Sequence, residues 1–472
     1  MSYFSLDGSV IAVFFWLKMP IYQPKEDFKS LFESNSFSSI DGLRALSSLL
    51  IIYLHVSQLF VLFIATYPSA EWFNYLQTNA FLFGVIFVNI LEVYFVLSGF
   101  LLTYSILTNN KNENHVNYFL FIFKRFLRYY PGLILMFVYM HLFGDLEQPY
   151  LPQSLSKYAV HLLFIMNYAK FDSWFYTLHM NWSNCVDFHV YIVLSLILRT
   201  LWIRYKLGLN QILKILICLL ILSIIICYCS FDSTIQIVKS GTRSHPFYQT
   251  TYERSKALFD TYNLTFPLNK SEFIDRYKLS SIVQFYIPTH VRFGSFITGS
   301  ILAVKLLIHK NENFMNENKI KKYIYWFLSL FLFAILCIRP SMNQADPPVI
   351  LICSIRQFIS MGIGYVLYTT LVDRKSLYYN NYLNKFLSSK YLIPFSKLSY
   401  LSYLIHTRIA YDLVGKGPLK ILIQYHIDIA SPICFIFTLI ITEFIACLYY
   451  CLVEQPFIRF TSRMLIVSKK KE

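Results

Sequence analysis

The stretch "SIDGLRALSSLLIIYLHVSQ" (Ser39–Gln58) is apolar enough to cross a membrane, and yet it contains Asp41, Arg44 and His55. At about 100° per residue, Arg44 and His55 project almost along one line of a helix, and Asp41 and Ser48 lie near that line. His55 would then lie roughly 16 Å deeper than Arg44. An ionisable side chain in a span costs about 2.5–3.5 kcal/mol on insertion scales, so the stripe indicates a functional polar surface. The alternative is an interfacial arginine that sets topology and a hydrogen-bonded core histidine.

The rest of the chain is also typical of a membrane protein. Of its 472 residues, 56% are hydrophobic and only 14% are charged, whereas about a quarter are charged in soluble domains. We predict an all-α integral membrane protein, a polytopic bundle of about ten transmembrane helices. The expected spans lie near 43–66, 81–106, 126–143, 185–204, 210–230, 282–308, 322–339, 348–372, 393–413 and 431–453.

The basic residues predict the orientation of these spans. The net charge is +16, but the lysines and arginines lie mostly in short runs between apolar stretches, which is typical of cytoplasmic connectors and not of a nucleic-acid-binding surface. Both termini are therefore expected in the cytoplasm. The sequons at Asn181, Asn263 and Asn269 all fall on the side expected outside, and they are candidate glycosylation sites.

The chain divides into one membrane domain and two short ends. We predict an N-terminal cytoplasmic or interfacial segment over 1–38, with an interfacial helix at Val10–Tyr22, a membrane domain over 39–460 and a basic cytoplasmic tail over 461–472. A long extracytoplasmic loop is expected at about 231–281. The nine cysteines include no paired spacing that suggests zinc, and we predict no metal and no bound cofactor.

Other polar residues lie within or beside the apolar stretches. "LEVYFVLSGFLLTYSIL" (Leu91–Leu107) contains Glu92, which predicts an arginine or histidine partner, and the pair Ser98-Gly99, where a helix or ligand can approach closely. "FKRFLRYYPGLIL" places Arg125 and Arg128 on one helical face. These two arginines fit either an anion-binding pair or ordinary positive-inside residues.

Together these motifs resemble the acyltransferase 3 family of integral membrane acyltransferases, in its invertebrate nose-resistant-to-fluoxetine-like branch. The resemblance runs over about 39–460, from Arg44-x10-His55 through "FVLSGFLL" and the R-x-x-R of "RFLRYYP". Later segments agree in order: "NWSNCVDFHVYIVL", "YIPTHVRFGSFITGSILA", "FSKLSYLSYLIHTRI" and "CLVEQPFIRF". The branch commonly has a Cys-containing extracellular domain before the membrane core, whereas only about 40 residues precede it here, so we expect a short or incomplete member.

The resemblance implies acyl transfer from cytosolic acyl-CoA, either acetyl-CoA or a longer one, to a hydroxyl acceptor at or across the membrane. It makes His55 the catalytic base or acyl relay, with Arg44 and Asp41 beside it, and Arg125 and Arg128 the binding site for acyl-CoA phosphates. We expect Arg44, His55, Arg125 and Arg128 to line one cavity open to the cytoplasm. Residues of second rank are Glu92, Asp187, Tyr403, His406 and Glu454. Either Arg44 or Tyr403 is expected to stabilise the oxyanion.

Two alternatives remain open. A lipid or small-molecule transporter could retain the fold without the chemistry, since the branch is associated with lipid and drug uptake, although the sequence lacks an internal repeat. The other membrane-bound O-acyltransferase family also uses an intramembrane histidine, but the ordered motifs argue against it. The expected partners are membrane lipids and acyl-CoA, and the expected location is the plasma membrane or an endomembrane.

Overall fold

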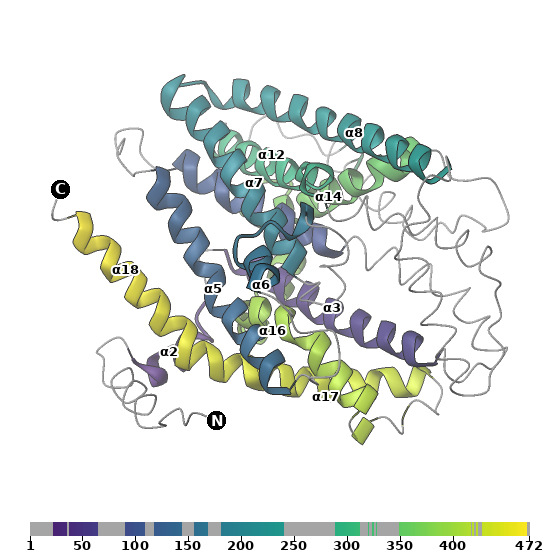
Figure 1. Cartoon of the computed structure of the whole chain (residues 1–472). Helices are drawn as coiled ribbons and strands as arrows, with labels where there is room; N and C mark the ends of the chain where they lie inside the picture. The colour runs from purple at the N-terminus through teal and green to yellow at the C-terminus, as the bar shows by residue number, and fades with distance from the viewer. Residues whose placement is uncertain are drawn as a thin grey trace.

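All regular structure in the described residues is helical (Figure 1). The computed structural model describes residues 22–34, 37–64, 90–108, 118–143, 155–168, 181–239, 288–311, 349–416 and 427–469, with a few isolated positions besides. Within these ranges, six helices are long and apolar enough to cross a membrane. They are Ser38–Ser57, Ile90–Thr108, Asn181–Arg204, Leu209–Ser230, Phe293–Lys310 and Ile429–Ser462. The chain is thus an all-α protein with the helices of a membrane-embedded one.

The longer elements are α3 (Ser38–Ile64), the Ile90–Thr108 helix, α5 (Tyr118–Phe143), α7 (Asn181–Arg199), α8 (Leu209–Lys239), α12 (Phe293–Asn311), α14 (Val349–Leu371), α16 (Ile393–Tyr411), α17 (Ile427–Tyr449) and α18 (Gln455–Lys469). The shorter ones are α2 (Pro24–Ser30), α6 (Leu155–Leu162), η1 (Met166–Tyr168), η3 (Thr200–Arg204), η5 (Thr289–Val291), α15 (Asn381–Leu387), η7 (Asp412–Lys416) and η9 (Tyr450–Glu454).

The expected count of about ten spans is not reached in the described residues. Helices α5, α14 and α16 occupy the expected spans 126–143, 348–372 and 393–413, but they are not among these six helices. In α16 a row of serines followed by a histidine makes the helix more polar than an ordinary span. The expected span 322–339 lies almost wholly outside the described residues.

Three of the predicted segments contain helix. Helix α8 continues to Lys239, so the first part of the predicted loop 231–281 is helical. Helix α18 continues to Lys469, so most of the predicted tail 461–472 is helical as well. The predicted N-terminal segment includes the short helix α2, and the interfacial helix expected at Val10–Tyr22 lies outside the described residues except for Tyr22.

The helices form two packed groups. Helices α3, α16 and α17 pack together on one side of the molecule, and α8, α12 and α14 pack together on the other (Figure 1). The first group has a small apolar core that contains Ile52, Val56, Ala410 and Cys434. The Ile90–Thr108 helix lies between the groups, because its residues join the core of α12 and α14 while Tyr94 reaches α3.

Glycines allow the Ile90–Thr108 helix to cross α12 with the two backbones in contact. A Cβ atom added to Gly99 would lie 2.0 Å from the carbonyl oxygen of Phe296, and one added to Gly299 would lie 2.0 Å from that of Val96. Just beyond the crossing, the Thr103 hydroxyl donates a hydrogen bond of 2.7 Å to the Ser300 hydroxyl of α12. The close approach predicted for Ser98-Gly99 is therefore confirmed as a helix contact.

The first and last described helices are joined by an ion pair. On α2, Asp27 is 3% exposed, and both of its carboxylate oxygens accept hydrogen bonds from the Arg459 guanidinium of α18, one of them at 2.7 Å. The forked guanidinium fits a carboxylate in this two-bond arrangement. The contact fixes the predicted N-terminal segment against the C-terminal helix.

Candidate functional site

The polar stripe predicted on α3 faces α16. The Ser396 hydroxyl donates a hydrogen bond of 3.1 Å to Asp41, and fourteen residues along α3 the His55 ring contacts the His406 ring. Since 41 pairs with 396 and 55 pairs with 406, the two helices run parallel with their polar faces together. His55 is 7% exposed and His406 is fully buried. The predicted histidine is thus held against another helix and does not face lipid.

The hydrogen bonds of the histidine pair assign its tautomers. His406 Nδ1 lies 3.0 Å from the carbonyl oxygen of Ser402, which can only accept, so Nδ1 carries a proton. In a neutral ring the other nitrogen of His406 is then an acceptor, and it lies 2.7 Å from His55 Nδ1. His55 Nδ1 therefore donates, and the basic lone pair of His55 is on Nε2. This arrangement resembles the orientation of a general base by a hydrogen-bonded neighbour.

Tyr403 lies beside the pair. Its ring centroid is 5.9 Å from that of His406, and its hydroxyl accepts a hydrogen bond of 3.1 Å from Ser183 of α7. The Trp-led segment at the start of α7 thus reaches the same place as the histidines. Of the two groups expected near the oxyanion, Tyr403 is the one adjacent to the pair.

The predicted arginines gather at the other end of the stripe. The Arg44 side chain is 24% exposed, lies 3.8 Å from Asp41, and its backbone carbonyl accepts a hydrogen bond from the Tyr94 hydroxyl. Arg125 and Arg128 of α5 both lie within electrostatic range of Arg44. Residues that are far apart in sequence therefore form one basic cluster.

The two arginines of R-x-x-R differ in environment, and this changes the sequence prediction. Arg125 forms an ion pair with Asp187 at 2.6 Å, and hydroxyls of Tyr129 and Ser98 also donate to that carboxylate. Arg128 is exposed, and it has no hydrogen bond or ion pair within the part of the chain that the structure describes. Arg125 already has a counter-ion, so Arg128 is the member best able to receive an anion.

Two acidic residues from the C-terminal part of the chain lie near the stripe. Glu454, at the end of η9, is 8% exposed and lies within electrostatic range of Arg128. Glu443 of α17, which sequence reasoning missed, lies beside Ser402 and within range of Tyr94. The signal was present, because Glu443 is a single acid within the apolar stretch 431–453, as Glu92 is within its own.

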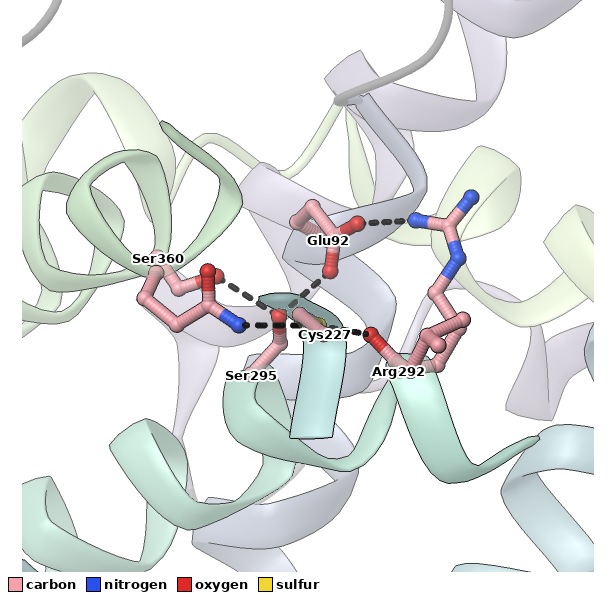
Figure 2. A network of polar contacts seen from close by, with 7 residues as sticks. Glu92, Cys227, Arg292, Ser295 and Ser360 are labelled. Carbon is pink, nitrogen blue, oxygen red and sulfur yellow. Dashed lines mark hydrogen bonds and ion pairs between the residues drawn. The ribbon is translucent and has the colours of Figure 1, made fainter. Parts of the chain in front are cut away.

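Glu92 belongs to a separate buried network, which Figure 2 shows in close view. Its carboxylate accepts hydrogen bonds from Arg292 and from the Ser295 hydroxyl, to which Ser360 of α14 donates at 2.8 Å. The Arg292 guanidinium also lies 5.0 Å from the centre of the Trp182 ring. Arg292 is the arginine partner that the sequence predicted for Glu92. Since these contacts hold helices together, we assign Glu92 a structural role.

The predicted glycan at Asn181 conflicts with the fold. Asn181 is fully buried at the start of α7, where its amide donates to the carbonyl oxygen of His161 at 3.3 Å and accepts from Asn184 at 3.0 Å. A bulky surface modification has no space there. Asn263 and Asn269 lie outside the described residues.

No family model, no curated protein and no solved structure matches the chain. Within the described residues, no group of three or more His, Cys, Asp or Glu side chains is arranged to hold a metal ion.

The candidate site consists of the histidine pair at one end of the α3 stripe and the arginine cluster at the other.

Proposed function

We propose that this protein is a multi-pass membrane O-acyltransferase that transfers an acyl group from cytosolic acyl-CoA to a hydroxyl acceptor. The observation that carries the proposal is the buried contact of 2.7 Å between His55 and His406, with its tautomers set by the Ser402 carbonyl. A neutral imidazole with its lone pair on Nε2 suits general-base work near neutral pH. The motif resemblance described above supports the same reaction.

The reaction needs one base and one oxyanion donor. His55 Nε2 takes the proton of the acceptor hydroxyl, and the oxygen attacks the thioester carbonyl carbon. As the tetrahedral intermediate collapses, the C–S bond breaks, and the proton that His55 took from the acceptor ends on the CoA thiolate. We assign the Tyr403 hydroxyl as the oxyanion donor, because it lies beside His406.

The donor enters from the arginine cluster. Arg128 and Arg44 bind the CoA phosphates by their guanidinium groups, and Arg125 supports them while it is held by Asp187. The clustering of Arg44, Arg125 and Arg128 at one end of the stripe supports this orientation, with that end and both termini on the cytoplasmic side. The cavity expected between Arg44 and His55 would hold the rest of the donor.

The proposal is tested with purified full-length protein in lipid nanodiscs. Wild-type protein should release CoA from acetyl-CoA, and His55→Ala should lower that rate about 10²–10⁴-fold at unchanged expression. His309→Ala is the matched control, because this histidine of α12 contacts Tyr368 and Tyr378 instead. Wild-type protein that neither binds nor cleaves acetyl-CoA would refute the enzyme and leave the transport alternative.

A further inference from the structure

Glu443 lies in the apolar segment "LIITEFIAC" (Leu439–Cys447) of α17, and no role described so far uses it. Both of its carboxyl oxygens are buried, and among the described residues neither has a hydrogen bond of ordinary geometry, although the Ser402 hydroxyl lies close enough to interact. The hydroxyls of Ser48 on α3, Ser402 on α16 and Thr442 on α17 are likewise buried without such a hydrogen bond to any described residue. Three packed helices thus direct poorly paired polar atoms into their shared interior, which is costly unless these atoms bind something.

Two contacts place Glu443 between the histidine pair and Arg44: Ser402 lies one turn before His406 on α16, and Tyr94 reaches the Arg44 backbone. Helix α17 runs antiparallel to α3, since Ser57 contacts Ser431 at 2.7 Å and Tyr53 packs on Phe435. Glu443 is eight residues beyond Phe435, which is about 12 Å further toward the Arg44 end.

The surroundings of Glu443 favour its neutral form. Among the described residues, the titratable groups within electrostatic range are Tyr94 and, one turn along α17, Cys447, while α16 contributes Ser402 and α3 contributes Ser48 beside Tyr94. None of these groups is a cation that would compensate a carboxylate. A buried carboxylic acid without a cationic partner remains neutral, and it can then donate a proton.

We propose that Glu443 is the acid that protonates the CoA thiolate, and that His55 restores its proton. This inference rests on the proposed acyl transfer.

The thiolate leaves toward the arginine end, where the donor entered, and Glu443 lies on that side of His55. As the C–S bond breaks, the Glu443 carboxyl gives its proton to sulfur. The His55 imidazolium, protonated by the acceptor hydroxyl, then returns a proton to Glu443. The net transfer is one proton from acceptor oxygen to sulfur, with no further reactant.

Leaving-group dependence is the direct test. Glu443→Gln should lower turnover of acetyl-CoA about tenfold or more with KM unchanged. The same variant should match wild type on p-nitrophenyl thioacetate, whose thiolate is stable without a proton. His55→Ala should impair both reactions, and Thr438→Val on the same helix should impair neither. An equal loss on both thioesters, or no loss on acetyl-CoA, would overturn the proposal. Glu443→Asp should restore part of the acetyl-CoA rate and shift its pH profile.

A second measurement is independent of turnover. Dicyclohexylcarbodiimide reacts with neutral carboxylic acids in apolar surroundings, so mass spectrometry should find the adduct on Glu443 and not on Glu92, which is paired with Arg292. An adduct on Glu92 alone would refute a neutral Glu443. If wild-type protein labels at Glu443 but cleaves neither thioester, the proposed function fails while the neutral acid stands.

Discussion

At the residue scale, the properties of the site depend on which nitrogen of each histidine donates a hydrogen bond and which accepts one. One backbone carbonyl, that of Ser402, sets the proton positions of two imidazole rings, because it accepts from His406 and leaves that ring with a single acceptor nitrogen. The consequence for His55 is a defined tautomer. A residue outside the histidine pair can therefore control the protonation of His55.

His406 is expected to act as a positioning residue. His406→Ala should lower turnover about 10–100-fold, as loss of an orienting partner does for metal-bound histidines, and thus less than His55→Ala. Glutamine can donate to the Ser402 carbonyl and accept from His55, so His406→Gln should retain most of the rate. Steady-state kinetics of acetyl-CoA cleavage would check this, and equal losses for both substitutions would contradict it.

A second histidine predicts how stability depends on pH. His161 of α6 lies outside the membrane-spanning segments and is 1% exposed, and burial lowers its pKa to about 4. Unfolded histidine has a pKa near 6.5, so the unfolded chain binds one more proton between these values, and stability falls as pH drops below about 6.5. The loss should reach about 1.4 kcal/mol at pH 5.5.

His161→Gln should remove this contribution. Thermal unfolding in detergent at pH 7.5 and at pH 5.5 would measure it, since the variant should lose less stability than wild type over that range. An unchanged pH dependence in the variant would show that His161 is protonated in the folded protein.

At the element scale, the helices are held together by close crossings at small residues and by buried polar pairs. The sequence predicts where such contacts are needed, but not which residues are the partners. Small residues and lone acids are visible in the sequence, which is why the Gly99 crossing and the need of Glu92 for a partner were predictable. The identity of a partner was not: Arg292 is 200 residues from Glu92, and His406 is 351 residues from His55. Long-range pairing depends on how the helices pack, which no local pattern records.

The glycine crossing predicts which small residues tolerate a methyl group. Gly99→Ala and Gly299→Ala should each destabilise the protein by about 1–3 kcal/mol or more, because the new Cβ meets backbone atoms that cannot move away. Gly364→Ala on α14 is the matched control, since its Cβ would meet only Thr298 at 3.6 Å. Unfolding temperatures in one detergent would compare the three, and equal shifts would refute the close crossing.

At the scale of the whole molecule, the first and last described helices lie on one side. Asp27 binds Arg459, the Ser38 hydroxyl donates to Ser388 at 2.7 Å, and Lys397 donates to the carbonyl oxygen of Ser30. These contacts gather α2, α15 and the starts of α3, α16 and α18. The charge pattern of the sequence predicts the cytoplasm for this side.

Glycan mapping tests that direction. Asn263 and Asn269 are expected on the outside, so in a glycosylating eukaryotic host the protein should migrate faster after glycosidase treatment, and Asn263→Gln with Asn269→Gln should abolish the shift. Asn181→Gln should leave the shift unchanged, because Asn181 is buried between His161 and Asn184. New sequons of the same type, placed at exposed Lys390 and Glu33 on the side of the termini, should remain unmodified. Modification at those two sites without any at Asn263 and Asn269 would invert the topology. It would also place the arginine cluster on the side away from cytosolic acyl-CoA.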